Sequence, residues 1–104
     1  MDSLQISVDK QKTQDVLKLE GSLTGQSIVT FRGVVDGLEK ANLKVLSFDM
    51  RSLKYIDSLG IGILIYYYNE LVKLGVNVNI SSPTDSVLEI LELTSLDKVI
   101  PIIS

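Results

Sequence analysis

The sequence predicts an α/β fold in which a mixed sheet of four to five strands packs against helices. In some segments hydrophobic and polar residues alternate, as in strands, and in others hydrophobic residues recur every three or four positions, as in helices. The predicted order is strand, strand, helix, strand, helix, strand, helix, and a short strand can follow. The 104 residues have room for one domain, which we expect to span 1–104.

The composition excludes several classes of function. The chain has no Cys and no His, which rules out disulfides, thiolate metal sites, thiol catalysis and a Ser-His-Asp triad. The formal net charge is −3 and the basic residues are scattered, which disfavours direct binding of nucleic acid or of an anionic membrane. We expect neither a metal nor another cofactor.

No segment resembles a membrane span or a signal peptide. The longest strongly apolar stretch, residues 61–68, is much shorter than the roughly 18–20 residues that a bilayer span needs. The first residues lack the basic and apolar regions of a signal peptide. We therefore expect a cytoplasmic protein.

Two strands are predicted at the start of the chain. Leu4, Ile6 and Val8 alternate with polar residues, which is typical of a half-buried strand. A second strand is expected over residues 16–22. The short connection between the two strands predicts that they pair antiparallel.

A first helix follows the second strand. Thr24 is its predicted N-cap, because apolar residues recur at helical spacing from Ile28 to Leu38. We expect this helix to end near Asn42. Gly33 and Gly37 lie one turn apart on its polar side, where they are either tolerated surface glycines or a place for a partner to approach closely.

The second half of the chain alternates strands and helices. Residues 44–50 and 76–81 are predicted strands, and the helix between them indicates a parallel, right-handed crossover. Ser82 and Pro83 predict the cap and the first turn of a last helix that ends by Ser95. Residues 99–103 can form a short strand, which Pro101 restricts to an edge.

The middle helix contains the most informative positions of the sequence. Ser58 is its predicted N-cap, and Gly75 is the predicted residue just past its C-terminus. More than half of its circumference is apolar, so we expect a buried central helix. The remainder is a narrow stripe with Glu70 at its margin, formed by Ser58, Gly62, Tyr66, Asn69 and Lys73.

Ser58 begins this stripe at the helix N-terminus. A serine exposed there is well placed to become a phosphoserine, because free backbone N–H groups and the helix dipole stabilise a phosphate. The alternative is a capping serine with no further chemistry. Gly60 and Gly62 lack the third glycine of a dinucleotide-binding fingerprint, and the chain has no P-loop, so we expect no enzymatic activity and no catalytic residue.

Five segments follow one another at characteristic spacing. They are Leu-Glu-Gly-Ser-Leu-Thr at 19–24, Val-Leu-Ser-Phe-Asp-Met at 45–50, Tyr-Ile-Asp-Ser-Leu-Gly-Ile-Gly at 55–62, Ser-Pro at 82–83 and Leu-Glu-Leu-Thr-Ser-Leu-Asp-Lys-Val at 91–99. In this order they resemble the STAS domain family, which includes bacterial anti-sigma factor antagonists and the cytoplasmic tails of sulphate transporters. The resemblance covers nearly the whole chain.

The resemblance to antagonists implies a regulatory cycle. Ser58 would be phosphorylated by an anti-sigma factor that is also a serine protein kinase, and a PP2C-type phosphatase would reverse the modification. The unphosphorylated form would bind the anti-sigma factor and free the sigma factor. Asp57 would be either an acidic contact or a local turn residue. The expected partner-binding residues are Asp57, Ser58, Leu59, Gly60, Gly62, Tyr66, Asn69, Lys73, Ser22 and Thr24.

The chain departs from the antagonist pattern at four positions. Ser22 and Thr24 stand where antagonists often have acidic residues, Leu59 replaces a small residue, and Ser95 replaces a glycine. Two other functions stay open, namely a non-catalytic STAS scaffold subunit of a larger stress-signalling assembly and a nucleotide-binding or hydrolysing module.

Overall fold

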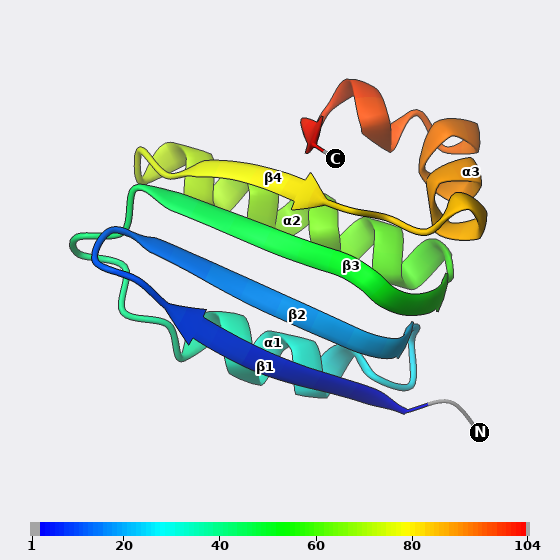
Figure 1. Cartoon of the computed structure of the whole chain (residues 1–104), viewed down its shortest axis with the longest axis horizontal. Helices are drawn as coiled ribbons and strands as arrows, with labels where there is room; N and C mark the ends of the chain where they lie inside the picture. The colour runs from blue at the N-terminus through cyan, green and yellow to red at the C-terminus, as the bar shows by residue number, and fades with distance from the viewer. Residues whose placement is uncertain (1–2, 104) are drawn as a thin grey trace.

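A computed structural model describes residues 3–103 as a mixed five-stranded sheet with helices, which confirms the predicted α/β class (Figure 1). The spatial order of the strands follows the sequence, β1-β2-β3-β4-β5. The strands are β1 (Leu4–Lys10), β2 (Gln14–Leu23), β3 (Val45–Ile56), β4 (Asn77–Ser81) and β5 (Ile102–Ile103). The helices are α1 (Ile28–Asp36), α2 (Ser58–Lys73), α3 (Asp85–Leu93) and the short 3₁₀ helix η1 (Leu96–Lys98).

Strand directions bring two helix starts together. β1 and β2 are antiparallel, while β2, β3, β4 and β5 pair in parallel, as the sequence predicts for the first pair and for β3 with β4. The carboxyl ends of β2 and β3 therefore lie side by side, where Leu23 pairs with Ile56. α1 and α2 both begin just beyond this edge and run back along the same face of the sheet (Figure 1).

The hydrophobic core lies between the sheet and these helices. Leu17 and Leu19 of β2 and Phe48 of β3 are at most 1% exposed, and Phe31 of α1 and Leu64 of α2 meet them from the helical side. This alternation of buried and exposed residues along the strands produced the period-two pattern in the sequence. Among residues 3–103, no helix has both the length and the hydropathy needed to cross a bilayer.

β3 is longer than the predicted strand at 44–50 and is irregular. Its register with β2 shifts between Lys18 and Glu20 and again between Gly21 and Ser22, so β3 contains extra residues at both places. At the first shift the Asp49 Oδ1 atom accepts hydrogen bonds from the Arg51 backbone N–H at 3.1 Å and from its Nε at 3.2 Å. Because bulges interrupt the alternation of hydrophobic residues, the sequence pattern stops before the strand does.

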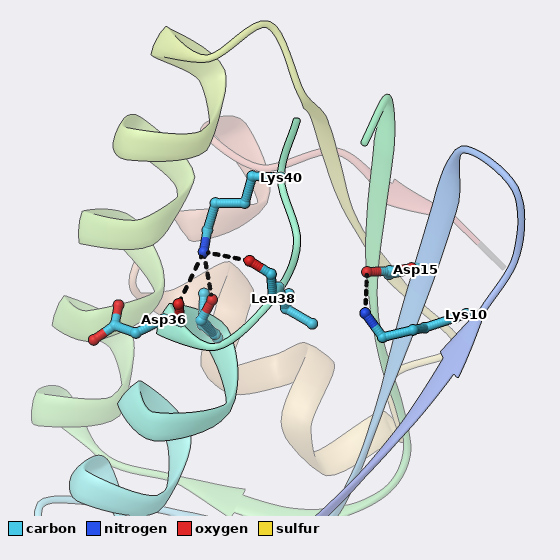
Figure 2. Close-up of polar contacts among 6 residues, drawn as sticks. Lys10, Asp15, Asp36, Leu38 and Lys40 are labelled. Atoms are coloured by element: carbon cyan, nitrogen blue, oxygen red, sulfur yellow. Dashed lines mark hydrogen bonds and ion pairs between the residues drawn. The ribbon is translucent and has the colours of Figure 1, made fainter. Parts of the chain in front are cut away.

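The boundaries of α1 differ from the prediction. Thr24 is not its N-cap, because Ser27 takes that position and Thr24 lies in the preceding turn, with the Ser27 N–H donating to the Thr24 carbonyl at 3.0 Å. The helix ends at Asp36, well before Asn42. Gly37 is the C-cap, and Lys40 stabilises this end, since its Nζ donates to the carbonyls of Val35, Asp36 and Leu38 at 2.9, 3.3 and 3.1 Å (Figure 2).

The predicted caps of the other two helices were also wrong. Asp57 caps α2 in place of Ser58, which is the first helical residue. Thr84 caps α3 in place of Ser82 and accepts the Val87 N–H at 3.3 Å. Gly75 does lie just past α2, with a φ of +83°. Ser95, which replaces a glycine of the antagonist pattern, has a left-handed φ of +60°.

The apolar side of α2 packs on the core, where Ile63, Ile65 and Tyr68 are partly buried beside its buried residues, as the sequence predicts. Only the end of this apolar side is open. Val72 and Leu74 are 46% and 62% exposed although both are apolar. The side that packs on the sheet is formed by Gly60, Ile61, Leu64, Tyr67 and Leu71.

The β1–β2 hairpin is closed by an ion pair at the far end of the sheet. The Lys10 Nζ atom lies 3.9 Å from the Asp15 Oδ2 atom, and these two residues are also partners in the strand register (Figure 2). The Asp15 side chain is only 7% exposed. Lys10 thus compensates the negative charge of a carboxylate that the fold largely desolvates.

Candidate functional site

Asp57 joins the two loops that follow β2 and β3. Its backbone N–H donates to the Leu23 carbonyl at 3.2 Å, its Oδ1 accepts the Gly60 N–H at 2.9 Å, and its Oδ2 accepts the Gly25 N–H at 3.2 Å. One half-buried carboxylate therefore caps α2 and also holds the turn before α1. Of the two roles that the sequence left open for Asp57, the geometry supports the local turn residue.

Two glycines allow these loops to approach closely. A Cβ on Gly60 would overlap the Leu23 carbonyl oxygen and lie 2.9 Å from Ile56 Cγ1. A Cβ on Gly25 would lie 2.6 Å from the Cδ1 atom of Leu59. The first turn of α2 thus rests directly on the strand ends, because no side chain separates the backbones.

Ser58 is exposed at the first position of α2. Asp57 already satisfies the next amides of the helix, since its side chain accepts the Gly60 N–H and its carbonyl accepts the Ile61 N–H at 2.9 Å. The N–H groups of Ser58 and Leu59 come earlier and have no carbonyl one turn before them in the helix. Together with the positive end of the helix dipole, they favour negative charge at this position.

The predicted stripe lies on the exposed side of α2. Ser58, Gly62, Tyr66, Asn69 and Lys73 are all exposed, and we call this set the recognition stripe. Tyr66 is 54% exposed, and the Lys73 Nζ atom lies 3.2 Å from the Glu70 Oε2 atom.

The other predicted partner-binding residues differ in their accessibility. Leu59 borders the recognition stripe and is 59% exposed. Thr24 is partly exposed, whereas Ser22 and Gly60 are buried. The structure therefore brings Leu59 to the surface beside Ser58 and places Ser22 and Gly60 beneath it.

Tyr67 connects the buried side of α2 to α1. Its hydroxyl donates to the Asp36 Oδ1 atom at 2.7 Å, and its ring packs against Phe31 at 5.9 Å and against the Tyr66 ring at 5.1 Å between centroids. Burial, followed by the Asp36 hydrogen bond, raises the pKa of Tyr67 above its usual 10.0, and Arg32 opposes this shift. The two helices are thus locked together below the exposed Tyr66.

Ser27 supports the site, and the sequence did not predict its role. The Ser27 hydroxyl donates to the Ser22 carbonyl and accepts the Thr24 N–H, both at 2.9 Å, and so shapes the turn that carries Gly25. These bonds cross a turn without periodicity, so hydrophobic spacing contains no signal for them. The Asp57 cap did have a signal, because Asp ranks with Ser as an N-cap and Gly60 follows three residues later.

Surface hollows lie elsewhere on the molecule. One of about 180 Å³ lies over β2 and β3 and has Lys18, Asp49 and Arg51 in its lining. Another of about 420 Å³ has Arg51 and Thr84 in its lining. Neither is lined by a residue of the recognition stripe. Within residues 3–103, no three acidic side chains gather as a metal site would require.

The fold places an exposed helix start beside the ends of two parallel strands. The family model described as "STAS domain" matches residues 5–104, and the chain therefore belongs to that family.

Solved structures show the same fold at low sequence identity. An anti-sigma factor antagonist from Mycobacterium paratuberculosis has a TM-score of 0.84 and 18% identity, over 96% of this chain and 85% of that one. The anti-sigma factor antagonist SpoIIAA in its unphosphorylated form has a TM-score of 0.79 and 15% identity, over 96% and 89%. A sulfate transporter family protein from Wolinella succinogenes has a TM-score of 0.78 and 19% identity, over 89% and 78%. The fold is thus common to both branches of the resemblance.

Proposed function

We propose that this chain is a cytoplasmic anti-sigma factor antagonist that acts as one STAS unit over residues 1–104. Its unphosphorylated form binds an anti-sigma factor that is also a serine protein kinase, which frees the sigma factor. Phosphorylation of Ser58 ends this binding, and a PP2C-type phosphatase restores it. The observation that carries the proposal is the exposed Ser58 at the start of α2, with Asp57 capping the helix beside it. The likeness to solved antagonists supports it.

The chemistry of this cycle belongs to the partners. The kinase transfers the γ-phosphoryl group of ATP to the Ser58 Oγ atom, and the hydroxyl proton leaves to a base of the kinase. The phosphate brings about −1.5 to −2 charges, which takes the chain from −3 to about −5. The N–H groups of Ser58 and Leu59 stabilise this charge within the folded protein.

Binding is lost without unfolding because the charge appears within the contact surface. Leu59 and Tyr66 provide the apolar contacts of that surface, and Gly62 leaves room for the partner backbone. A phosphate between them must be desolvated in the complex and lies next to the Asp57 carboxylate. In the free protein the same phosphate remains hydrated, so no free energy is lost to desolvation.

Phosphorylation by the cognate kinase is the decisive test. We expect the anti-sigma kinase whose gene lies nearest to the gene of this protein to add one phosphate from ATP. Mass spectrometry should map this phosphate to Ser58. Ser58→Ala should prevent the modification and keep the binding, and Ser58→Asp should weaken binding about tenfold or more. Ser86 is a matched control, because it is also exposed in the first turn of a helix. Ser86→Asp should leave binding unchanged.

Two results would contradict the proposal. One is undiminished binding by Ser58→Asp together with an unphosphorylated wild type. The other is the absence of any complex with the kinase in either state, combined with stable incorporation into a large STAS assembly measured by light scattering. The second result would favour the scaffold subunit.

A further inference from the structure

The outer edge of β1 is a row of backbone groups that pair with no other strand of the described residues. Within residues 3–103, β1 is the first strand of the sheet and pairs only with β2. The Ser22 N–H donates to the Ser3 carbonyl, and the Gln11 N–H donates to the Gln14 carbonyl. Because hydrogen-bonded positions alternate along an antiparallel strand, these bonds assign the odd-numbered residues to β2. The outward backbone groups belong to Leu4, Ile6, Val8 and Lys10.

The two edges of the sheet differ in how well they are protected. β5 has two residues and follows Pro101, so it offers little to an approaching strand. β1 has 7 residues, contains no proline, and keeps one unbroken register with β2 from Leu4 to Lys10. Proteins usually blunt such an edge with proline, bulges or charges. β1 therefore retains the capacity to pair with another strand.

The side chains of β1 become more exposed toward its end. On the helical side of the sheet, Leu4 is 7% exposed, Ile6 is partly buried against the core, and Val8 is 38% exposed. On the other side Gln5, Ser7 and Asp9 are exposed. A strand added beside β1 would cover the apolar row on one face and extend the polar row on the other.

The charges of β1 select the partner and its direction. Asp9 and Lys10 are the only charged residues of the strand, and both lie at its C-terminal end. A parallel second copy would bring Asp9 beside Asp9 and Lys10 beside Lys10. An antiparallel second copy places them opposite Gln5 and Leu4, so no like charges meet. The strand is thus complementary to itself in the antiparallel direction.

We propose that β1 pairs antiparallel with β1 of a second copy of this chain, about a two-fold axis that passes through Ser7. In this register Ile6 lies opposite Val8, Gln5 opposite Asp9 and Leu4 opposite Lys10, so the outward backbone groups of both strands bond to each other. One continuous sheet then runs through both copies. α2 lies on other strands of the sheet (Figure 1), so Ser58 stays accessible and the dimer is independent of the proposed phosphorylation.

Single cysteines test this register directly, because the chain has no Cys of its own. Ser7→Cys places a thiol opposite its own counterpart, in a pair with a Cα separation of about 4.5 Å that a disulfide can bridge. Gln5→Cys is the matched control, because its counterpart lies four residues away, at about 13 Å. Under mild oxidation Ser7→Cys should form a disulfide-linked dimer at least about tenfold faster than Gln5→Cys.

Analytical ultracentrifugation tests the dimer itself. The wild type should sediment as a concentration-dependent dimer, and Val8→Lys should raise the dissociation constant about tenfold or more because it places a charge at the new contact. Val72→Lys makes the same change at a valine of α2 that is 46% exposed and should leave the constant unchanged. A wild type that stays monomeric up to about 1 mM overturns the proposal. Equal cross-linking of the two cysteine variants overturns it as well.

Discussion

At the scale of single residues, Asp57 is the local turn residue, one of the two roles that the sequence left open. Its two carboxylate oxygens accept N–H groups from two segments, Gly60 in the first turn of α2 and Gly25 in the turn before α1. A side chain that makes both contacts fixes the start of α2 and so positions Ser58. Asp57 thus holds Ser58 at the exposed start of the helix.

Removal of this carboxylate should destabilise the fold. Asp57→Ala leaves the Gly60 N–H without its cap and releases the Gly25 N–H, and we expect a loss of about 1–2 kcal/mol in the free energy of unfolding. Urea denaturation measures the loss, and hydrogen exchange of the two amides should accelerate. Asp57→Asn is the control, because its amide oxygen still caps Gly60 and should preserve most of the stability. An Asp57→Ala variant with wild-type stability would show that the cap contributes nothing.

At the scale of elements, the site depends on how closely α2 approaches the ends of β2 and β3. Gly60 faces the Leu23 carbonyl, so the first helical turn rests on the strands without an intervening side chain. Gly62 lies two residues later on the opposite side of the helix, and a Cβ there would meet nothing within 4 Å. The same residue type therefore serves packing at one position and an open surface at the other.

Alanine substitutions at these two glycines should act in opposite directions. Gly60→Ala forces α2 away from the strands, and we expect it to cost about 1–3 kcal/mol. Gly62→Ala places a better helix former on an open surface and should stabilise the protein by up to about 1 kcal/mol. Chemical denaturation of the two variants measures both effects. Equal destabilisation by both substitutions would contradict the close packing assigned to Gly60.

At the scale of the whole molecule, the two main helices form one layer over the sheet. Tyr67 connects them through its hydrogen bond to Asp36 and its ring contact with Phe31. The recognition stripe is exposed on the outside of this layer, while the opposite side of α2 belongs to the core. A charge added to the stripe therefore changes the surface of the molecule and leaves the core packing intact.

The tyrosine link makes the stability of the molecule sensitive to alkali. Burial and the Asp36 hydrogen bond raise the pKa of Tyr67 above 10.0, so the folded state holds this proton more tightly than the unfolded chain. The resulting stabilisation is complete below pH 10 and is lost as the pH rises through the folded pKa. Between about pH 8 and pH 11 the free energy of unfolding should fall less for Tyr67→Phe than for the wild type. Tyr66→Phe changes a tyrosine that is 54% exposed. The free energy of unfolding of this control variant should fall as much as that of the wild type.

The sequence by itself determined which elements form and in what order. Leu4, Ile6 and Val8 predicted a strand, and the helical spacing from Ile28 to Leu38 predicted a helix, because local periodicity reports which face of an element is buried. The exposed face of α2 was predicted for the same reason, since its five residues share one side of a single helix. A resemblance spread over the whole chain then indicated the family.

Only the tertiary structure decided how these elements begin, end and meet. Ser and Asp are equally good N-caps, so the sequence did not decide between Ser58 and Asp57. Asp57 became the cap, and it also accepts the N–H of Gly25, which lies 32 positions away along the chain. The extension of β3 depends on its pairing with β2, and Lys40 folds back onto the carbonyls at the end of α1. Each feature rests on hydrogen bonds formed where segments or turns fold back on one another, and hydrophobic periodicity does not encode such bonds.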